Sequence, residues 1–215
     1  MNNIAVVISS CDKYSFIWEA YKTIFQKYWS DCPYPIYFIT NNMDAPFGQT
    51  IRVGDLDWAS GVIKALNKVK EKTIVWLLED YWFTNMVNTL DLNKLCTFIN
   101  TTECDHIRLY VSNQSKQIPR QKFTEDLDLL NKEEDYRCSL NAGLWKKNIL
   151  LNLIESGNNI WDSEHIMTNK SRSKLFCTVK EMKYIIYNID NNMIEQGKIT
   201  KAGYEYLQRE GISIS

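Results

Sequence analysis

Short apolar segments alternate with amphipathic ones along the first half of the chain, and this alternation constrains the fold more than any other feature. The apolar runs have the length and composition of buried strands and lie at 4–10, 36–40, 51–53, 73–78 and 106–110. The segments between them show helical spacing of apolar residues and lie at 15–29, 58–69 and 91–101. Because strands that alternate with helices form βαβ units, we predict an α/β fold with a mostly parallel central sheet.

The second half of the chain is less regular. Residues 112–137 are polar and carry both charge signs, which is typical of a mobile flap or a surface excursion. Beyond them we predict strands at 138–145, 176–179 and 185–188, and helices at 146–155 and 200–209. No repeat or low-complexity tract interrupts the sequence, so we predict a single domain over 1–215.

The charge balance disfavours one class of partner. The chain has 25 Lys and Arg residues against 26 Asp and Glu residues, a formal net charge of −1, whereas nucleic-acid-binding domains carry a basic surplus. No apolar run approaches the roughly 20 residues that span a bilayer, and no charged leader precedes the first strand. We therefore expect a cytoplasmic protein that binds no nucleic acid and makes at most peripheral contact with a membrane.

Cysteine and histidine spacing does not predict a metal centre. The six cysteines form no C-x-x-C pair, and only His106 and His165 could join them. A structural zinc site is therefore disfavoured, and we expect reduced, mostly buried thiols. Aromatic residues are abundant instead, with 7 Trp, 12 Tyr and 8 Phe. They suit either a large core or a site that stacks on bases or sugar rings.

Ligand-binding residues are expected where the predicted strands end, because parallel sheets bind ligands at the carboxyl ends of their strands. The residues at these ends are Ser10-Cys11-Asp12, Asn41-Asn42, Asp55-Leu56-Asp57 and Glu79-Asp80. The sequence contains no G-x-G-x-x-G, no G-x-x-x-x-G-K-[ST] and no G-x-S-x-G. A Rossmann dinucleotide site, a P-loop and a hydrolase nucleophile elbow are therefore disfavoured.

The acid pair Glu79-Asp80 is the sharpest of these features. The most apolar predicted strand, 73–78, delivers both carboxylates at its end. Carboxylate oxygens suit Mg²⁺ or Mn²⁺, which would in turn hold a diphosphate; the alternative is an acid pair that caps the next turn. A literal D-x-D occurs at Asp55-Leu56-Asp57, where Asp57 is more simply explained as the N-cap of the following helix.

The turn after the first strand contains Ser10, Cys11, Asp12 and Tyr14. Asp12 could accept a hydrogen bond from a base or a ribose, and Tyr14 could stack on a ring. The alternative is an N-cap turn that leads into the helix at 15–29. The two interpretations are compatible, since a helix N-terminus favours a nearby phosphate.

A second acidic and aromatic cluster contains Trp161, Asp162 and Glu164. Inverting sugar transfer needs a carboxylate that takes the proton of the acceptor hydroxyl, and Glu164 suits this role better than Asp162; the alternative is a solvated helix start. Near the C-terminus, Lys198 follows Gly197 and could neutralise a departing diphosphate. As a lone lysine, it could equally be a surface residue.

Taken together, these segments resemble a family of small bacterial GT-A-like glycosyltransferases found with surface-polysaccharide biosynthesis. The resemblance extends in order over nearly the whole chain, although each motif is short. The matching segments are Val7–Tyr14, Tyr28–Pro33, Gly54–Trp58, Leu77–Tyr81, Leu140–Trp145, Trp161–Glu164 and Gly197-Lys198.

The resemblance implies a GT-A-like, Rossmann-type sandwich with a nucleotide-binding half at 1–111 and an acceptor half at 112–215. It implies a nucleotide-sugar donor, a saccharide or lipid-linked acceptor, and action in the cytoplasm near the inner face of the membrane. By position, Asp80 resembles the acid that contacts a metal or the diphosphate, and Glu164 resembles the base. Glu79-Asp80 departs from a full D-x-D, so a metal-free enzyme could use Lys198 and backbone amides in place of Mn²⁺ or Mg²⁺.

These features lead to one hypothesis and two rivals. Direct, inverting displacement would use Ser10, Cys11, Asp12 and Tyr14 with Asp57, Glu79, Asp80 and Lys198 on the donor side, and Glu164 as base beside an acceptor held by Trp82, Trp145 or Trp161. A sugar nucleotidyltransferase would share the fold class but would need a glycine-rich loop after the first strand, which is absent. A non-catalytic nucleotide-sugar-binding subunit would bind the donor without ever hydrolysing it.

Overall fold

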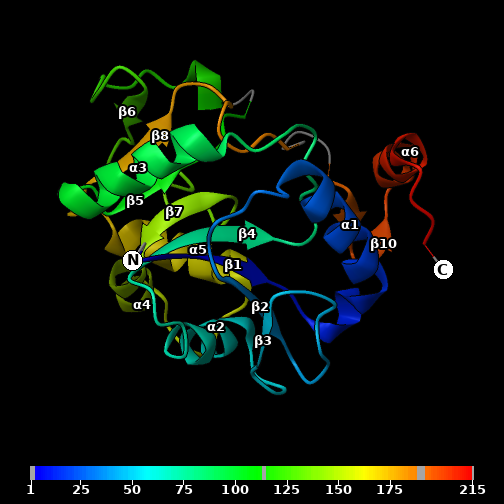
Figure 1. The fold of residues 1–215 in the computed structure, drawn as a ribbon. Coiled ribbons are helices and arrows are strands. Elements are labelled where there is room, and N and C mark those ends of the chain that lie inside the picture. The colour runs from blue at the N-terminus through cyan, green and yellow to red at the C-terminus, as the bar shows by residue number, and fades with distance from the viewer. Residues whose placement is uncertain (1–2, 113–114, 188–191, 215) are drawn as a thin grey trace.

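A computed structural model describes residues 3–112, 115–187 and 192–214, and Figure 1 shows how their helices and strands are arranged. The strands of the main sheet are β1 (Ile4–Ser9), β2 (Ile36–Thr40), β3 (Gln49–Arg52), β4 (Thr73–Leu78), β5 (His106–Arg108), β6 (Leu127–Leu129), β7 (Gly143–Lys146) and β8 (Phe176–Val179). The helices are α1 (Trp18–Tyr28), α2 (Trp58–Leu66), α3 (Thr89–Thr101), α4 (Lys147–Leu153), α5 (Ile160–Lys170) and α6 (Lys201–Glu210). Short 3₁₀ helices η1 (Asp12–Ile17) and η2 (Ser115–Gln117) and a hairpin of β9 (Ile194–Glu195) and β10 (Lys198–Ile199) complete the described elements.

The main sheet has eight strands in the order β3-β2-β1-β4-β7-β5-β8-β6. Strands β1 to β4 are parallel, and β5 and β8 are parallel to each other. Strand β7 is antiparallel to both β4 and β5, so all six of these strands run the same way, and β6 is antiparallel to β8. The α/β fold with a mostly parallel central sheet, predicted from strand–helix alternation, is confirmed, and strands from both halves of the chain join one sheet.

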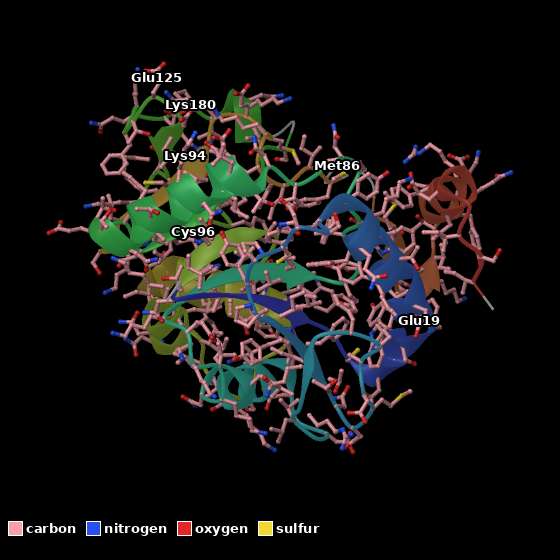
Figure 2. The ribbon with its side chains drawn as sticks, viewed as in Figure 1. Glu19, Met86, Lys94, Cys96, Glu125 and Lys180 are labelled. Atoms are coloured by element: carbon pink, nitrogen blue, oxygen red, sulfur yellow. The ribbon has the colours of Figure 1, made fainter. Side chains whose placement is uncertain are left out.

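Helices cover both faces of the sheet, which gives three layers (Figure 1). Each β1 side chain is buried, and alternate residues enter opposite cores: Val6 packs with side chains of α1 and α3, while Val7 packs with those of α2, α4 and α5. In Figure 2, side chains fill the space between α3 and the sheet; Cys96 on that helix is buried, whereas Lys94 is exposed. This burial of both faces is typical of parallel sheets.

Several predicted elements are confirmed with their boundaries, among them the strands at 36–40, 73–78 and 176–179. The predicted helix at 15–29 is divided into η1 and α1. The first residue of η1, Asp12, is held by the residue that follows β2. Its N–H donates to Asn41 Oδ1 (2.9 Å), and its carboxylate accepts the Asn41 N–H (3.0 Å).

The second half differs more from the prediction. Residues 112–137 were expected to form a flap or surface excursion, yet β6 lies within them and closes one edge of the main sheet by pairing with β8. In the predicted strand at 185–188, Tyr187 makes only an isolated bridge to Phe83, and residue 188 lies outside the described residues. Residues 1 and 2, which precede the predicted first strand, lie outside them as well. Within the described part of the chain, no helix is long and apolar enough to cross a bilayer.

Gly143 illustrates how tightly the antiparallel strand β7 is packed. A Cβ at this position would lie 2.7 Å from His106 Cε1. That ring cannot move away easily, because it is buried and stacks on Trp145 with ring centroids 3.7 Å apart. Glycine is therefore the residue that lets β5 and β7 approach each other here.

Gly143→Ala is expected to lower the free energy of unfolding by about 1–3 kcal/mol through overpacking, measured by urea denaturation. Gly61→Ala, on α2, is the matched control: its new methyl would meet only the Val53 side chain, with Cγ2 at 3.1 Å and Cβ at 3.8 Å, and alanine favours the helix. A Gly143→Ala protein as stable as the wild type would show that the His106 ring can be displaced without cost.

Candidate functional site

The order of the strands creates a natural ligand site between β1 and β4. The chain runs from β1 outward to β2 and β3 and then returns to β4 on the other side of β1. Such a reversal leaves a crevice outside the carboxyl ends of the two central strands, where open α/β sheets bind their ligands. Ser10 and Cys11 follow β1, and Glu79 and Asp80 follow β4. The topology therefore brings two of the predicted strand-end groups together.

A cavity of about 210 Å³ lies at this point, and we refer to it as the strand-end cavity. The first turns of α2 and α5 supply its remaining walls. Its lining residues are Ser9, Ser10, Cys11, Tyr14, Trp58, Leu78, Glu79, Asp80, Ile160 and Trp161. Six residues of the predicted site thus line one cavity, although they come from three separate parts of the sequence.

The acid pair in the strand-end cavity is held in an unusual electrostatic state. Burial raises the pKa of Glu79 well above its usual range, and the neighbouring Asp80 raises it further. Burial also raises the pKa of Asp80, to about 6. Asp80 Oδ1 is buried and has no hydrogen-bond partner among the described residues. Two adjacent carboxylates with so little compensation are typical of a functional site and are costly for stability alone.

The pair also fits a divalent cation. An unpartnered carboxylate oxygen lies beside a second carboxylate, and Mg²⁺ in proteins is commonly bound by one or two carboxylates together with substrate phosphates. The protein does not supply a complete cage by itself: among the described residues, no three His, Cys, Asp or Glu side chains gather in a way that could hold a metal. Asp80 and Glu79 would therefore hold a cation jointly with a phosphate ligand.

The residues after β1 support this pair from the opposite wall. Trp18 Nε1 donates to Ser10 Oγ (2.8 Å), and the Ser10 hydroxyl in turn lowers the pKa of Glu79 by hydrogen bonding. The thiol pKa of Cys11 is raised by burial and by Glu79, so this cysteine remains protonated. Tyr14 has a raised pKa for the same reasons, with Asp80 adding to the effect.

A second cavity, of about 310 Å³, contains Glu164, and we call it the Glu164 cavity. It is lined by Tyr81, Arg108, Tyr110, Ser112, Ile118, Glu134, Asp135, Tyr136, Ser139, Asn141 and Glu164. Glu164 Oε1 accepts the N–H of Leu140 (2.6 Å). Burial nevertheless raises the pKa of Glu164, which makes its carboxylate a stronger base than an exposed one.

Tyr81 lies between the two cavities. It follows Asp80 directly in the chain and lines the Glu164 cavity. Its pKa is raised by burial first, then by the charges of Asp80, Tyr110 and Glu164, which places both carboxylates near its hydroxyl. The Tyr81 hydroxyl therefore lies near one acid of each cavity.

Two predicted donor-side acids have structural partners instead of lining the strand-end cavity. The Asp12 carboxylate accepts the backbone N–H groups of Asn42 (2.9 Å) and Met43 (3.2 Å) as well as Asn41, and so ties the ends of β1 and β2 together. Asp57 Oδ1 accepts the N–H of Ser60 (2.9 Å) as the N-cap of α2 and that of Gly157 (3.0 Å). Asp57 thus performs the capping role that the sequence indicated as the simpler alternative.

Two of the three tryptophans expected to hold an acceptor lie in the core. Trp82 and Trp145 have no exposed surface, and Trp82 Nε1 donates to Glu79 O (3.0 Å). A ring buried on all sides has no face to offer an acceptor, so their predicted role must be corrected to a structural one. Trp161 is 70% exposed and borders the strand-end cavity, beside the donor-side residues.

Lys198 is exposed on the β9–β10 hairpin and does not line the strand-end cavity. The hairpin borders it, however, because the Gly197 backbone hydrogen-bonds to Tyr14 and a Cβ on Gly197 would touch Lys13 Cε at 2.8 Å. Gly197 has φ +77°, a conformation that glycine adopts freely.

Sequence reasoning missed most of the Glu164 cavity. Arg108, at the carboxyl end of β5, carried an available signal, because a charged residue within an apolar strand is rarely buried without a partner. Tyr81 and Asn141 lie in the segments Leu77–Tyr81 and Leu140–Trp145, where the sequence directed attention to the acid pair and to Trp145 instead. Glu134 gave no local signal, since it lies in a polar segment with many charges.

No protein-family model matches this sequence, and no curated protein matches it either. Solved structures do match its fold. S. aureus TarS 1–349 in complex with UDP-GlcNAc has 10% sequence identity and a TM-score of 0.56, covering 96% of this chain and 64% of that one. Without the nucleotide sugar, TarS 1–349 is covered over 59% of its length. The chain thus spans less than two thirds of these TarS structures.

Two further structures are covered more completely. CMP:2-keto-3-deoxy-manno-octonic acid synthetase complexed with CTP has 13% identity and a TM-score of 0.57, with 97% of this chain and 98% of that chain covered. Glucosyl-3-phosphoglycerate synthase from Mycobacterium tuberculosis, in complex with Mn²⁺ and UDP-glucose, has 10% identity and a TM-score of 0.51, with 99% and 80% covered. Likeness at this level of identity shows the fold alone, which is the Rossmann-like sandwich of GT-A type.

The raised pKa of Asp80 predicts how stability depends on pH. The folded protein holds this proton up to about pH 6, whereas an unfolded aspartate releases it near pH ~3.9. Between these values the folded state binds more protons than the unfolded state, so the free energy of unfolding falls as the pH rises. At about 1.4 kcal/mol per unit of pKa, the loss is roughly 1–3 kcal/mol.

Asp80→Asn is therefore expected to be more stable than the wild type at about pH 8 and to lose this advantage near pH ~4. Urea denaturation in the presence of a chelator measures the difference. Asp55→Asn is the control, because Asp55 is exposed and its replacement leaves the buried pair intact. Equal stability of Asp80→Asn and wild type at both pH values would show that the carboxylate is not desolvated.

Proposed function

We propose that this chain is a glycosyltransferase of GT-A type, which moves a sugar from a nucleotide-sugar donor to a saccharide or lipid-linked acceptor. One observation carries the proposal: the strand-end cavity, with its acid pair at the topological switch point, lies near a second cavity with a partly buried carboxylate, since Tyr81, which lines the second cavity, has its hydroxyl close to both Asp80 and Glu164. Two adjoining sites, one suited to a diphosphate and the other to a hydroxyl, are what transfer between two substrates requires.

The strand-end cavity would take the donor. Ser10, Cys11 and Tyr14 would contact the nucleotide, and Glu79 and Asp80 would hold the diphosphate through Mg²⁺ or Mn²⁺, which supplies positive charge for the leaving group when bound. The solved structures with UDP-GlcNAc, UDP-glucose and CTP have the same fold, which supports a nucleotide ligand.

Peripheral residues would support the same site. The exposed ring of Trp161 is placed to stack on part of the donor or on the acceptor where the two meet. Lys198, on the neighbouring hairpin, would neutralise the departing diphosphate. Asp12 and Asp57 would act indirectly, because their carboxylates hold the loop after β2 and the start of α2 in place around the cavity.

The chemical step would be a direct displacement that inverts the anomeric carbon. The acceptor hydroxyl oxygen forms a bond to that carbon while the bond from carbon to the diphosphate oxygen breaks. Glu164 takes the hydroxyl proton, and the nucleoside diphosphate leaves with the electron pair. The raised pKa of Glu164 supports this role, because a general base works best when its pKa approaches the working pH.

The resemblance to enzymes of surface-polysaccharide biosynthesis suggests where the reaction takes place. We propose that the chain acts in the bacterial cytoplasm, at the inner face of the membrane, on an acceptor that belongs to a growing surface polysaccharide. Contact with the membrane would be peripheral.

Donor binding is tested by thermal unfolding with UDP-, GDP-, CMP- and dTDP-sugars, each with and without Mn²⁺. A ligand that binds only the folded state stabilises it by about 2.7 kcal/mol at 100 times Kd, so one nucleotide class is expected to raise the melting temperature. Asp80→Asn should abolish the Mn²⁺-dependent part of this rise, while Asp55→Asn should retain it. Absence of any rise with all four classes would contradict the donor site.

Glu164→Gln is expected to lower the turnover of sugar transfer by roughly 10²–10⁴-fold, because an amide cannot accept the hydroxyl proton. The amide oxygen can still accept the Leu140 N–H, so the fold and donor binding should persist. The measurement is the rate of nucleoside diphosphate release with acceptor present, and Glu155→Gln, at an exposed position in the segment between α4 and α5, is the control. Unchanged turnover in Glu164→Gln would remove Glu164 from the mechanism.

A sugar nucleotidyltransferase is the second candidate, favoured by the near-complete mutual coverage with the CTP-bound synthetase. The turn Ser9-Ser10-Cys11-Asp12-Lys13 weighs against it, because it has no glycine where a phosphate would need close approach to the backbone. Release of pyrophosphate from a nucleoside triphosphate and a sugar phosphate would establish this activity. A third outcome, donor binding without any transfer or hydrolysis, would indicate a non-catalytic binding subunit.

A further inference from the structure

The floor of the Glu164 cavity is built from a buried ion network. Arg108 Nη1 donates to Glu134 Oε1 (2.9 Å), and Arg120 donates to the same carboxylate through Nε (3.0 Å) and Nη2 (2.7 Å). The three side chains are between 2% and 7% exposed. A charge network buried to this degree is expensive for folding, and it fixes the Arg108 guanidinium in one orientation.

Two buried polar atoms on residues that line this cavity are without partners within the described ranges. Arg108 uses both terminal nitrogens, with Nη2 donating to Tyr136 O (2.7 Å), but its Nε–H has no acceptor. Asn141 donates through Nδ2 to Ser139 Oγ (3.1 Å), but its Oδ1 has no donor. One orphan is therefore a donor and the other an acceptor. Buried polar groups are rarely left unpaired, so each of them indicates a missing ligand group.

Aromatic rings surround these polar atoms. Tyr81, Tyr110 and Tyr136 line the cavity, and the Arg108 guanidinium lies over the Tyr110 ring at 5.3 Å. Tyr136 adopts a left-handed backbone conformation (φ 52°). This conformation is uncommon for a residue with a bulky side chain. Its carbonyl is thereby available to Arg108 while its own ring remains half exposed. Aromatic faces beside polar groups suit the apolar C–H face of a sugar ring.

The charges in the cavity do not favour an anion. Two guanidinium groups face the carboxylate of Glu134, and the cavity also holds Asp135 and Glu164. Positive charge therefore does not exceed negative charge. A phosphate or carboxylate has only acceptor atoms and would leave Asn141 Oδ1 unpaired, whereas a hydroxyl both donates and accepts. A neutral polyhydroxylated ring can accept from Arg108 Nε–H, donate to Asn141 Oδ1 and pack its C–H face against the tyrosine rings.

From these observations we propose that the Glu164 cavity is the acceptor subsite, and that it takes an uncharged saccharide unit whose hydroxyl groups pair with Arg108 and Asn141. This inference rests on the proposed function, and it narrows the acceptor. Any phosphate of a lipid-linked acceptor lies outside the cavity, and the sugar that enters has neither a phosphate nor a carboxylate. Arg108 and Asn141 position this sugar for Glu164.

Ligand-observed saturation-transfer NMR on the full chain tests the proposal directly. The probes are methyl glycosides of glucose, galactose, N-acetylglucosamine and rhamnose, against glucose 6-phosphate and glucuronic acid as charged counterparts. Each is measured alone and with the nucleoside diphosphate that the thermal panel identifies. At least one neutral glycoside is expected to bind at least tenfold more tightly than both charged sugars. Tighter binding of a charged sugar would overturn the proposal.

The Asn141→Asp variant tests whether the glycoside binds in this cavity. The substitution replaces the amide with a carboxylate, which repels Glu164 and cannot donate to Ser139. A loss of at least tenfold in affinity for the neutral glycoside is expected, while Asn148→Asp, which adds the same charge at an exposed position on α4, should bind like the wild type. Equal affinity in wild type and Asn141→Asp would overturn the assignment of the cavity.

The transferase proposal and the acceptor-subsite proposal can be contradicted independently of each other. If no saccharide binds while a nucleotide sugar raises the melting temperature, the acceptor subsite is wrong and the donor site stands. If saccharides bind as expected and no nucleotide sugar does, the cavity is a sugar site and the transferase proposal is wrong. Because the wild-type measurement needs no substitution, a variant that fails to fold leaves the test intact.

Discussion

The burial of two adjacent carboxylates at the end of β4 is the constraint on which the site depends. Glu79 and Asp80 follow a strand buried on both faces and line the strand-end cavity, where Glu79 is buried and Asp80 is partly buried. Their desolvation opposes ionisation of both groups, and each raises the cost of charging the other. The protein compensates only in part, through backbone hydrogen bonds to both acids and the Ser10 hydroxyl beside Glu79. A bound cation would supply the missing compensation, so the same desolvation that lowers stability would favour cation binding.

Strand β7 explains why a second cavity lies beside the first. It enters the sheet antiparallel between β4 and β5, so the loop that leads into it, with Asn141, lies at the same edge as the carboxyl ends of its neighbours. Arg108 ends β5 at this edge, and α5 brings Glu164 across it. The close approach at Gly143 keeps these strands in register. The reversed strand thereby brings the loop with Asn141 to the same sheet edge as Glu79 and Asp80.

The residues of the strand-end cavity could largely be predicted from sequence, and those of the Glu164 cavity could not. The strand-end rule needs only an apolar run and the residues after it, which is why Ser10, Tyr14 and Asp80 converge as expected. The Glu164 cavity depends on pairings between distant segments, such as Arg108 with Glu134, that leave no local pattern. Composition also misled: aromatic residues near acids suggested acceptor contacts, but Trp82 and Trp145 fill the core because large rings contribute most apolar area there.

The position of Tyr81 makes the two cavities energetically dependent on each other. Its ring lines the Glu164 cavity, it follows Asp80 of the strand-end cavity directly in the chain, and the nearby charges of Asp80 and Glu164 act on its hydroxyl. A ligand that shifts this ring or neutralises either acid changes the environment of the other ligand. Thermodynamic linkage then requires the effect to be reciprocal, whichever ligand arrives first. In the proposed transferase, communication between donor and acceptor would thus need no moving domain, because both acids act on one side chain.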